Sequence, residues 1–294
     1  MAEEASDAPA PLVLHAGEDS VTVDPADGAR LTSLVAGGAE RLLDTAGSHD
    51  PRMGWGAFLM APWAGRLENA TVPWEGQHHR IPATHGRHAI HGVTLDARWE
   101  LEERGDRSVV LYCDLEDGGW PLGGGVELRI NLSEGALALT TSIVAGPSGM
   151  PAGAGWHPWF RRPANGDVAV TVLASETLRT DAELIPDGMR CPVDTDTDLR
   201  GGPLLGERRL DHAYVDVDGP VEVRWPDLVL RMDIDAAPRT YVVHTPEYAF
   251  CVEPQSVWPN APGLSAAGLA ETGLAPLGPG AACVVRSEWR WERR

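Results

Sequence analysis

The clearest pattern in this chain is an alternation of apolar and polar residues over residues 126–145, which read VELRINLSEGALALTTSIVA. Every second residue of the first half is apolar, and these residues are Val126, Leu128, Ile130 and Leu132. Alternate residues of an extended chain point to the same side, so the pattern predicts a half-buried strand. Residues 133–135 interrupt the alternation, which resumes at Leu137. The segment is therefore predicted to form a β-hairpin.

Further short apolar runs follow along the chain, bounded by Gly, Pro, Asp or Asn. They span residues 108–116, 168–174, 221–225, 228–235, 240–245 and 283–291. No stretch shows an amphipathic helical pattern of comparable strength, and no fixed repeat or long linker divides the chain. We therefore expect an all-β fold, a large antiparallel sandwich or barrel, forming one domain over residues 10–294. Residues 1–9 are expected to be a disordered leader.

Charge limits the partners that this chain can have. Its 294 residues include 43 acidic and 24 basic ones, which gives a formal net charge of -19. Such a charge repels polyanions, so we expect no nucleic acid and no membrane surface as a partner. All basic residues are arginine, which excludes mechanisms that need a Schiff-base or P-loop lysine. The acidic N-terminus lacks a signal-peptide pattern and the four cysteines are widely spaced, which favours a cytoplasmic protein.

A cluster of histidines is the first candidate for chemistry, and its members are His78, His79, His85, His88 and His91. His85, His88 and His91 are spaced so that they would share one face of a helix, but Gly86 and Gly92 make a helix unfavourable. On a strand, His88 would point away from the other two. A zinc or manganese site built from these three histidines is therefore a less favoured alternative.

A second candidate is His157, which lies in the segment AGWHPWF at residues 154–160. A histidine among aromatic residues is commonly a hydrogen-bonded core residue, but it is also a common general acid or base. The chain has 11 tryptophans against 4 tyrosines and 3 phenylalanines. Indole rings offer flat faces on which the C–H face of a sugar can stack, and two of them, Trp156 and Trp159, lie close to His157 in sequence. These observations favour a sugar-binding site.

Five separated segments resemble motifs of the aldose 1-epimerase (galactose mutarotase) family, particularly its bacterial members. In chain order they are APWAGRLENATVPWEG (61–76), HAIHG (88–92), AGWHPWF (154–160), LDHAYVDVDG (210–219) and CVEPQS (251–256). Because they also follow the order of the family, the set is more specific than any single segment. The resemblance implies a galactose mutarotase-like supersandwich of two large, mostly antiparallel sheets with an open sugar-binding cleft. It also implies an isomerase that interconverts the α and β anomers of a free aldose.

The resemblance further implies roles for six residues. His157 would be the general acid and Glu253 the general base of ring opening, and the sugar would be held by Arg66, His91, Asp211 and Trp159. This chemistry needs an ionised Glu253 and a charged His157, so we expect Asp211 to lie close enough to raise the pKa of the histidine. Two positions depart from the family pattern, since Gly65 replaces an asparagine and Trp159 replaces a tyrosine. Both departures bear on the preferred sugar more than on the reaction.

Three other functions remain as alternatives. A hexose-6-phosphate 1-epimerase would use the same pair but needs several arginines around a phosphate, and Arg161 and Arg162 follow the histidine motif. A metal-dependent sugar isomerase would use the histidine cluster. A non-catalytic carbohydrate-binding protein would keep the cleft without turnover. We expect an enzyme that acts on a small sugar and needs neither cofactor nor metal, because proton transfer to a hemiacetal requires no Lewis acid.

Overall fold

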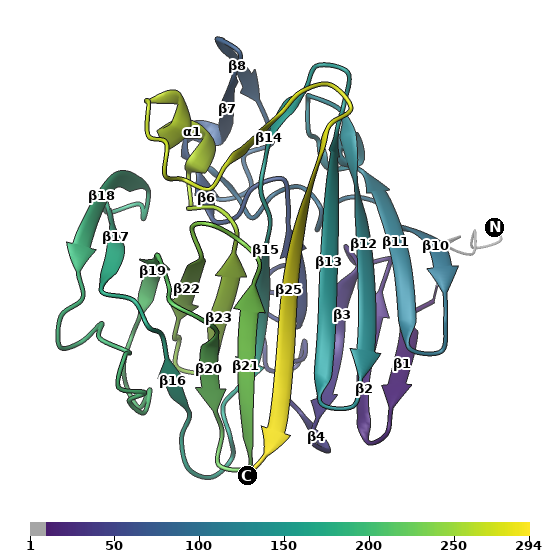
Figure 1. The fold of residues 1–294 in the computed structure, drawn as a ribbon, viewed down its shortest axis with the longest axis vertical. Coiled ribbons are helices and arrows are strands. Elements are labelled where there is room, and N and C mark those ends of the chain that lie inside the picture. The colour runs from purple at the N-terminus through teal and green to yellow at the C-terminus, as the bar shows by residue number, and fades with distance from the viewer. Residues whose placement is uncertain (1–9) are drawn as a thin grey trace.

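Two antiparallel sheets stacked face to face make up most of the structure, a computed structural model that describes residues 10–294 (Figure 1). The expected leader at residues 1–9 lies outside the described residues. Every pairing between named strands in the described part is antiparallel. The expected all-β sandwich is therefore confirmed. A barrel is excluded because the edge strands of the two sheets do not pair with each other.

The larger sheet has eleven strands, and its order is β1-β2-β3-β5-β15-β23-β22-β19-β17-β18, with β4 paired to β3. Its strands are β1 (Leu12–Ala16), β2 (Asp19–Asp24), β3 (Arg30–Ala36), β4 (Ala39–Glu40), β5 (Ala57–Met60), β15 (Gly155–Arg161), β17 (Glu176–Thr180), β18 (Pro186–Pro192), β19 (Asp211–Val215), β22 (Thr240–His244) and β23 (Ala249–Gln255). The strands β5, β15, β23 and β22 therefore lie next to one another at its centre, although they come from distant parts of the chain.

The smaller sheet has eight strands in the order β10-β11-β12-β13-β25-β21-β20-β16. Its strands are β10 (Glu100–Arg104), β11 (Ser108–Asp114), β12 (Gly124–Ser133), β13 (Ala136–Ala145), β16 (Ala169–Thr171), β20 (Val221–Arg224), β21 (Leu228–Ile234) and β25 (Ala282–Arg293). The hairpin expected over residues 126–145 is confirmed as β12 and β13, with Leu132 opposite Leu137 beside the turn. The other alternating runs also form strands, of which the run at 240–245 belongs to the larger sheet.

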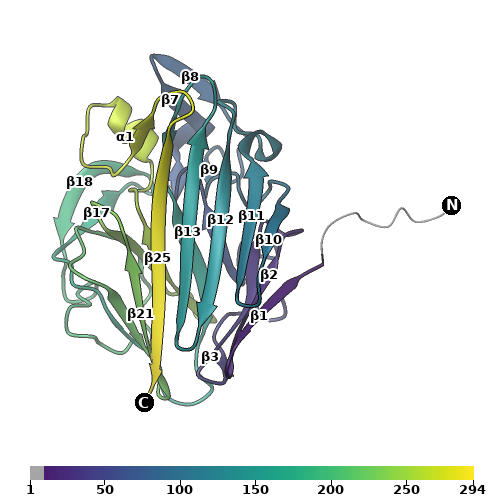
Figure 2. The same cartoon turned by 45° about the vertical axis from the view of Figure 1, so that its right-hand side comes forward.

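Short elements cap one end of the sandwich, where Figures 1 and 2 both place the β7–β8 hairpin beside α1. They are β6 (Arg66–Leu67), η1 (Glu68–Ala70), β7 (Thr71–Trp74), β8 (Gln77–Arg80), β9 (Ala89–Ile90), η2 (Leu115–Gly118), β14 (Met150–Ala152), α1 (Ala261–Ala266) and β24 (Ala275–Leu277). Because α1 has only six residues, the expectation of a fold without substantial helices is confirmed. No helix in the described part of the chain is long and apolar enough to cross a membrane.

The main core lies between the two sheets and is built by the alternate residues of each strand. Trp156 of β15 meets Trp289 of β25 edge to face, with 6.3 Å between ring centroids, and both rings are buried. Phe160, four residues after Trp156 and on the same face of the strand, joins the same core. His157 and Trp159 therefore point to the opposite face of the larger sheet, because successive side chains of a strand alternate in direction. That face is the one on which a site can form.

Candidate active site

The pairing of two neighbouring strands brings His157 and Glu253 together. The register of β15 and β23 places Gly155 opposite Gln255 and Trp159 opposite Cys251, which puts His157 opposite Glu253. The Nε2 atom of His157 lies 3.4 Å from Oε1 of Glu253. Both side chains are almost entirely buried, at 5% and 2% exposed. The fold therefore places a titratable pair on the face of the larger sheet that points away from the core between the sheets.

Above this pair lies a cavity of about 280 Å³. Polar side chains from distant segments line it, and they are Asp50, Arg66, His85, His91, His157, Thr180, Asp211, His244, Tyr248, Glu253 and Gln255. The remaining wall is mostly apolar and includes Met53, Trp159 and Leu184. A concave, mostly apolar surface with a few converging polar groups is typical of a small-molecule site.

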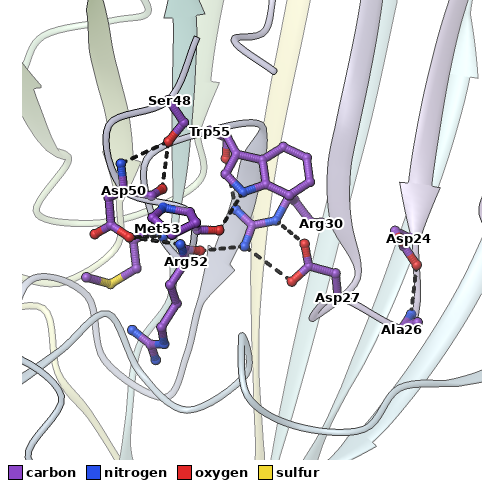
Figure 3. Close-up of polar contacts among 10 residues, drawn as sticks. Asp24, Ala26, Asp27, Arg30, Ser48, Asp50, Arg52, Met53 and Trp55 are labelled. Atoms are coloured by element: carbon purple, nitrogen blue, oxygen red, sulfur yellow. Dashed lines mark hydrogen bonds and ion pairs between the residues drawn. The ribbon is translucent and has the colours of Figure 1, made fainter. Parts of the chain in front are cut away.

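One wall of the cavity is a turn that a buried arginine holds in place (Figure 3). Arg30 is 1% exposed, and its guanidinium donates to the backbone oxygens of Arg52 (2.7 Å) and Trp55 (2.9 Å) and to Asp27 (2.7 Å). Asp50 and Met53, which line the cavity, belong to the same turn. Backbone oxygens and a carboxylate satisfy this buried cation. Asp50 Oδ1 also accepts hydrogen bonds from the backbone N–H groups of Arg52 (2.8 Å) and Met53 (3.1 Å), so the turn is held in place from within as well.

Two aromatic rings and one amide orient the His157–Glu253 pair. The imidazole is stacked on Phe58 and on Trp159, at 4.9 Å and 5.3 Å between ring centroids. Gln255 donates from Nε2 to Oε2 of Glu253 at 3.1 Å. Stacking fixes the plane of the imidazole, so the ring edge with Nε2 is the part directed at the carboxylate.

Burial sets the charge of this pair. Desolvation is the main reason that the pKa of Glu253 is raised well above its usual value, and the negative charge of Asp211 adds to the effect. Desolvation likewise lowers the pKa of His157 well below its usual value, with smaller effects from His91 and His244. Both shifts favour the neutral forms, since a charged group loses its hydration when it is buried. Burial therefore works against the ionised Glu253 and the charged His157 that the expected chemistry needs.

Arg66 and His91 stand together at the cavity wall. Arg66 makes no ion pair within 4.0 Å in the described part of the chain, and its buried Nε has no hydrogen-bond partner there. The His91 ring meets the His157 ring edge to face at 4.8 Å between centroids. Burial, followed by the nearby Arg66 charge, lowers the pKa of His91 to about 3. A free guanidinium and a neutral imidazole are suited to hydrogen bonds with hydroxyl groups.

Asp211 lies in the cavity wall but not beside His157. It faces His244, its register partner on β22, with 3.8 Å between Asp211 Oδ2 and His244 Nδ1. The strands β22 and β23 separate it from β15, so its charge acts on Glu253 and His244. The expectation that Asp211 raises the pKa of His157 is therefore wrong, because the neighbouring strand supplies a nearer histidine.

The two departures from the family pattern have structural counterparts. Trp159 lines the cavity, but it stacks on both His157 and Tyr248, which leaves less of the indole face for a sugar than expected. Gly65 has a φ of 70°, and a Cβ at this position would lie 2.6 Å from Cβ of Pro259. A larger residue is excluded there while Pro259 keeps its place, since that distance is far below van der Waals contact.

The histidine cluster does not form the metal site considered from the sequence. His85 and His91 line the cavity, whereas His88 is turned away and accepts a hydrogen bond at Nδ1 from the backbone N–H of Asn69 (3.0 Å). Gly86 lies in the turn between His85 and His88, which bond to each other through their backbones. Within residues 10–294, the one group of three side chains placed to hold an ion is instead His157, Cys251 and Glu253.

All six residues expected from the sequence therefore surround one cavity, namely Arg66, His91, His157, Trp159, Asp211 and Glu253. Sequence reasoning missed His244, Gln255 and Asp50. The first two carried a usable signal: Gln255 follows Glu253 by two residues on one strand, and His244 ends an alternating run. Asp50 belongs to a turn whose sequence gave no comparable signal.

Comparison with known proteins agrees with this architecture. A family model described as aldose 1-epimerase matches residues 13–269. The uncharacterized protein YphB of Escherichia coli K12 is 26% identical over 106 residues, which is 35% of this chain and 36% of that protein. The structure of a candidate aldose 1-epimerase from Escherichia coli K12 matches with a TM-score of 0.83 at 19% identity, covering 97% of this chain and 99% of that chain.

Galactose 1-epimerase from Lactobacillus acidophilus NCFM has the same fold, with a TM-score of 0.75 at 16% identity, covering 99% of this chain and 97% of that chain. At these identities the solved structures establish a galactose mutarotase-like sandwich. The family model covers most of the sequence and includes every expected site residue. The chain therefore belongs to the aldose 1-epimerase family of carbohydrate epimerases.

Proposed function

We propose that this protein is an aldose 1-epimerase that interconverts the α and β anomers of a free aldose in the cavity above His157 and Glu253. The observation that carries the proposal is the buried contact of 3.4 Å between His157 Nε2 and Glu253 Oε1, at the floor of a cavity lined with polar groups. Anomer interconversion needs one group that accepts a proton and one that donates a proton on the same side of the sugar.

The reaction balances with these two groups alone. Glu253 takes the proton from the C1 hydroxyl while His157 gives a proton to the ring oxygen, so the C1–O5 bond breaks and C1 becomes an aldehyde. Rotation about C1–C2 turns the other aldehyde face toward O5. Ring closure then returns one proton from Glu253 to O1 and one from O5 to His157, which restores the starting state.

Burial of the pair favours the ring-opening direction of proton transfer. The pair begins as carboxylate and imidazolium and becomes carboxylic acid and neutral imidazole when the ring opens. The raised pKa of Glu253 and the lowered pKa of His157 both favour the second state. Bound sugar and the positive charge of Arg66, which lowers the pKa of Glu253, would stabilise the first state.

Unsatisfied polar atoms suggest how the sugar is held. Within residues 10–294, six buried polar atoms without a partner belong to cavity residues: Arg66 Nε, His91 Nδ1, His157 Nδ1, Trp159 Nε1, His244 Nδ1 and Gln255 Oε1. Such groups are normally completed by water or a polar ligand. We assign the sugar hydroxyls to Arg66, His91 and Asp211, with Trp159 forming part of the wall.

The charge of the cavity favours a free sugar over a phosphorylated one. Among the described residues, Arg66 is the one arginine that lines it, against the carboxylates of Asp50, Asp211 and Glu253. Arg161 and Arg162 are bonded elsewhere, to Asp44 and to the backbone oxygens of Leu42, Gly206 and Pro246. A dianionic phosphate needs several converging arginines, and the described part of this cavity offers one.

Polarimetry with freshly dissolved anomers tests the proposal. The panel consists of glucose, galactose, xylose, arabinose and glucose 6-phosphate, each with and without EDTA. We expect at least one neutral sugar to relax faster than in buffer, with the highest kcat/KM among the neutral sugars and no effect of EDTA. No acceleration of any sugar would contradict the proposal, and a higher kcat/KM for glucose 6-phosphate would favour the phosphosugar alternative.

A further inference from the structure

Cys251 is a buried thiol beside the proposed catalytic pair that the anomer reaction does not use. It precedes Glu253 by two residues on β23, so both side chains point to the same face of the sheet. One ligand atom each from His157, Cys251 and Glu253 lies within 4.8 Å of the others. All three side chains are buried, and that of Cys251 is completely inaccessible. A nitrogen, a sulfur and an oxygen donor therefore converge at the floor of the cavity.

We propose that His157, Cys251 and Glu253 form a binding site for a thiophilic divalent cation of the zinc type, and that an ion bound there blocks the sugar site. The donor set is that of zinc, which accepts imidazole, thiolate and carboxylate, whereas calcium and magnesium prefer oxygen donors. Three protein ligands leave one position of a tetrahedral ion free.

The distances are close to those that a bound ion requires. Zinc bonds of about 2.0 to 2.3 Å in a tetrahedron separate the ligand atoms by about 3.3 to 3.8 Å. His157 Nε2 and Glu253 Oε1 are already 3.4 Å apart. The sulfur therefore has to approach them by about 1.0 to 1.5 Å at most, which a rotation of short side chains can supply.

Charge balance supports the same ion. A thiolate and a carboxylate together carry two negative charges, which neutralise a divalent cation in a buried place where a net charge would be costly. Binding releases the thiol proton of Cys251 and any proton that Glu253 carries, since a metal holds only the deprotonated groups.

The free fourth position explains why binding blocks the site. His157 and Glu253 line the cavity, whereas Cys251 is fully buried and does not line it, so we place the open side of the ion toward the space assigned to the sugar. An ion held there occupies both groups that would exchange protons with the sugar. This part of the inference rests on the proposed function, but the binding itself does not.

Cobalt(II) titration of the full chain tests binding without any assay of activity. We expect a thiolate-to-cobalt charge-transfer band in the wild type, its loss in Cys251→Ser and Cys251→Ala, and its retention in Cys191→Ser, whose half-buried thiol is the matched control. Circular dichroism checks that each variant is folded. No band in the wild type, or a band that persists in folded Cys251→Ser, would overturn the site.

Zinc inhibition of mutarotation tests the blocking step. Each variant is compared with its own rate in EDTA, and Cys251→Ser should raise the inhibitory zinc concentration at least about 100-fold, because losing a group that only supports a ligand already costs about 10- to 100-fold. Added sugar should relieve inhibition of the wild type. Inhibition that sugar does not relieve would overturn the blocking step, whereas absence of mutarotation with the cobalt band intact would overturn only the proposed function.

Discussion

The smaller sheet, which we call the outer sheet, differs from the central strands of the larger sheet in how its faces are covered. In β12 and β13 of the smaller sheet, buried positions alternate with half-buried or exposed ones. In β15 and β23 nearly every residue is buried, because the main core covers one face and the cavity walls cover the other. A second covered face allows polar groups to be held away from water at fixed positions.

The cost of that arrangement is visible in hydrogen bonding. Arg66, His91, His157, Trp159, His244 and Gln255 around the cavity each have a buried polar atom without a partner in the described residues, whereas in the smaller sheet only Trp291 does. Buried polar groups normally have partners. We call the face of the larger sheet that carries the cavity the site face. The difference indicates that the site face is organised for a ligand, whereas the outer sheet is organised for stability.

The largest expected effect of a change on the site face is that of His157→Asn. It should lower kcat by about 10²- to 10⁴-fold, the usual contribution of one positioned acid or base. Asparagine keeps a polar group at the position, so thermal unfolding should remain cooperative. Stopped-flow polarimetry with the preferred sugar measures the rate, and an unchanged kcat in the folded variant would return His157 to a structural role.

A variant that combines His157→Asn with Glu253→Gln should lose far less activity than the product of the two single losses. The two groups exchange protons with the same sugar in one step, so removing the second matters little once the first is gone. The three variants are compared in one double-mutant cycle. Losses that multiply would show that the two groups act independently.

Changes at the cavity wall should act mainly on KM. Arg66→Ala and Asp211→Asn should each raise KM by about 10-fold or more, since a hydrogen bond to a charged group contributes about 1.5 to 3 kcal/mol. Asp211→Asn should also lower the pKa of Glu253, because the Asp211 charge raises it. The acid limb of the pH profile of kcat/KM, which reports ionisation of the general base Glu253, would therefore shift toward lower pH. If Asp211→Asn instead lowered the pKa of His157, the expectation that Asp211 raises the pKa of this histidine would be restored.

The smallest expected effect is that of His91→Asn on the free energy of unfolding at low pH. The pKa of His91 is lowered to about 3, so between pH 6.5 and 3 the unfolded chain binds a proton that the folded chain does not. The free energy of unfolding must therefore fall as the pH falls through this range. His91→Asn, which tolerates the φ of 63°, should reduce that fall by about 1 kcal/mol per pH unit. Urea unfolding at pH 6.5 and 5 measures it, and equal slopes would contradict the assignment.

The outer sheet was the easier part to predict because its strands have one covered face. Alternation at residues 126–145 predicted both strands and the turn of the β12–β13 hairpin. The central strand β5 was not predicted, since residues 57–60 are buried on both faces and show no alternation. A short apolar run of this kind does not distinguish a strand from other buried segments.

The candidate residues could be named from the sequence, but their electrostatics could not. Motifs at His157 and Glu253 indicated an acid and a base. The motifs follow one another along the chain in the same order as in the family, and this linked the pair to Arg66 and Asp211. The pKa directions depend on which strands are neighbours, and the sequence did not show that Asp211 would face His244. The position of Cys251 was likewise hidden, because the register of β15 with β23 is what brings its sulfur close to His157.

The most direct test makes the same chemical change in both regions and measures anomer exchange at equilibrium by NMR. Glu253→Gln alters the site face, and Glu127→Gln alters the outer face of β12, where the side chain is half-buried. We predict that Glu253→Gln slows anomer exchange of the preferred sugar by about 10²- to 10⁴-fold, whereas Glu127→Gln leaves the exchange rate at the wild-type value. Equal rates in the two folded variants would contradict it.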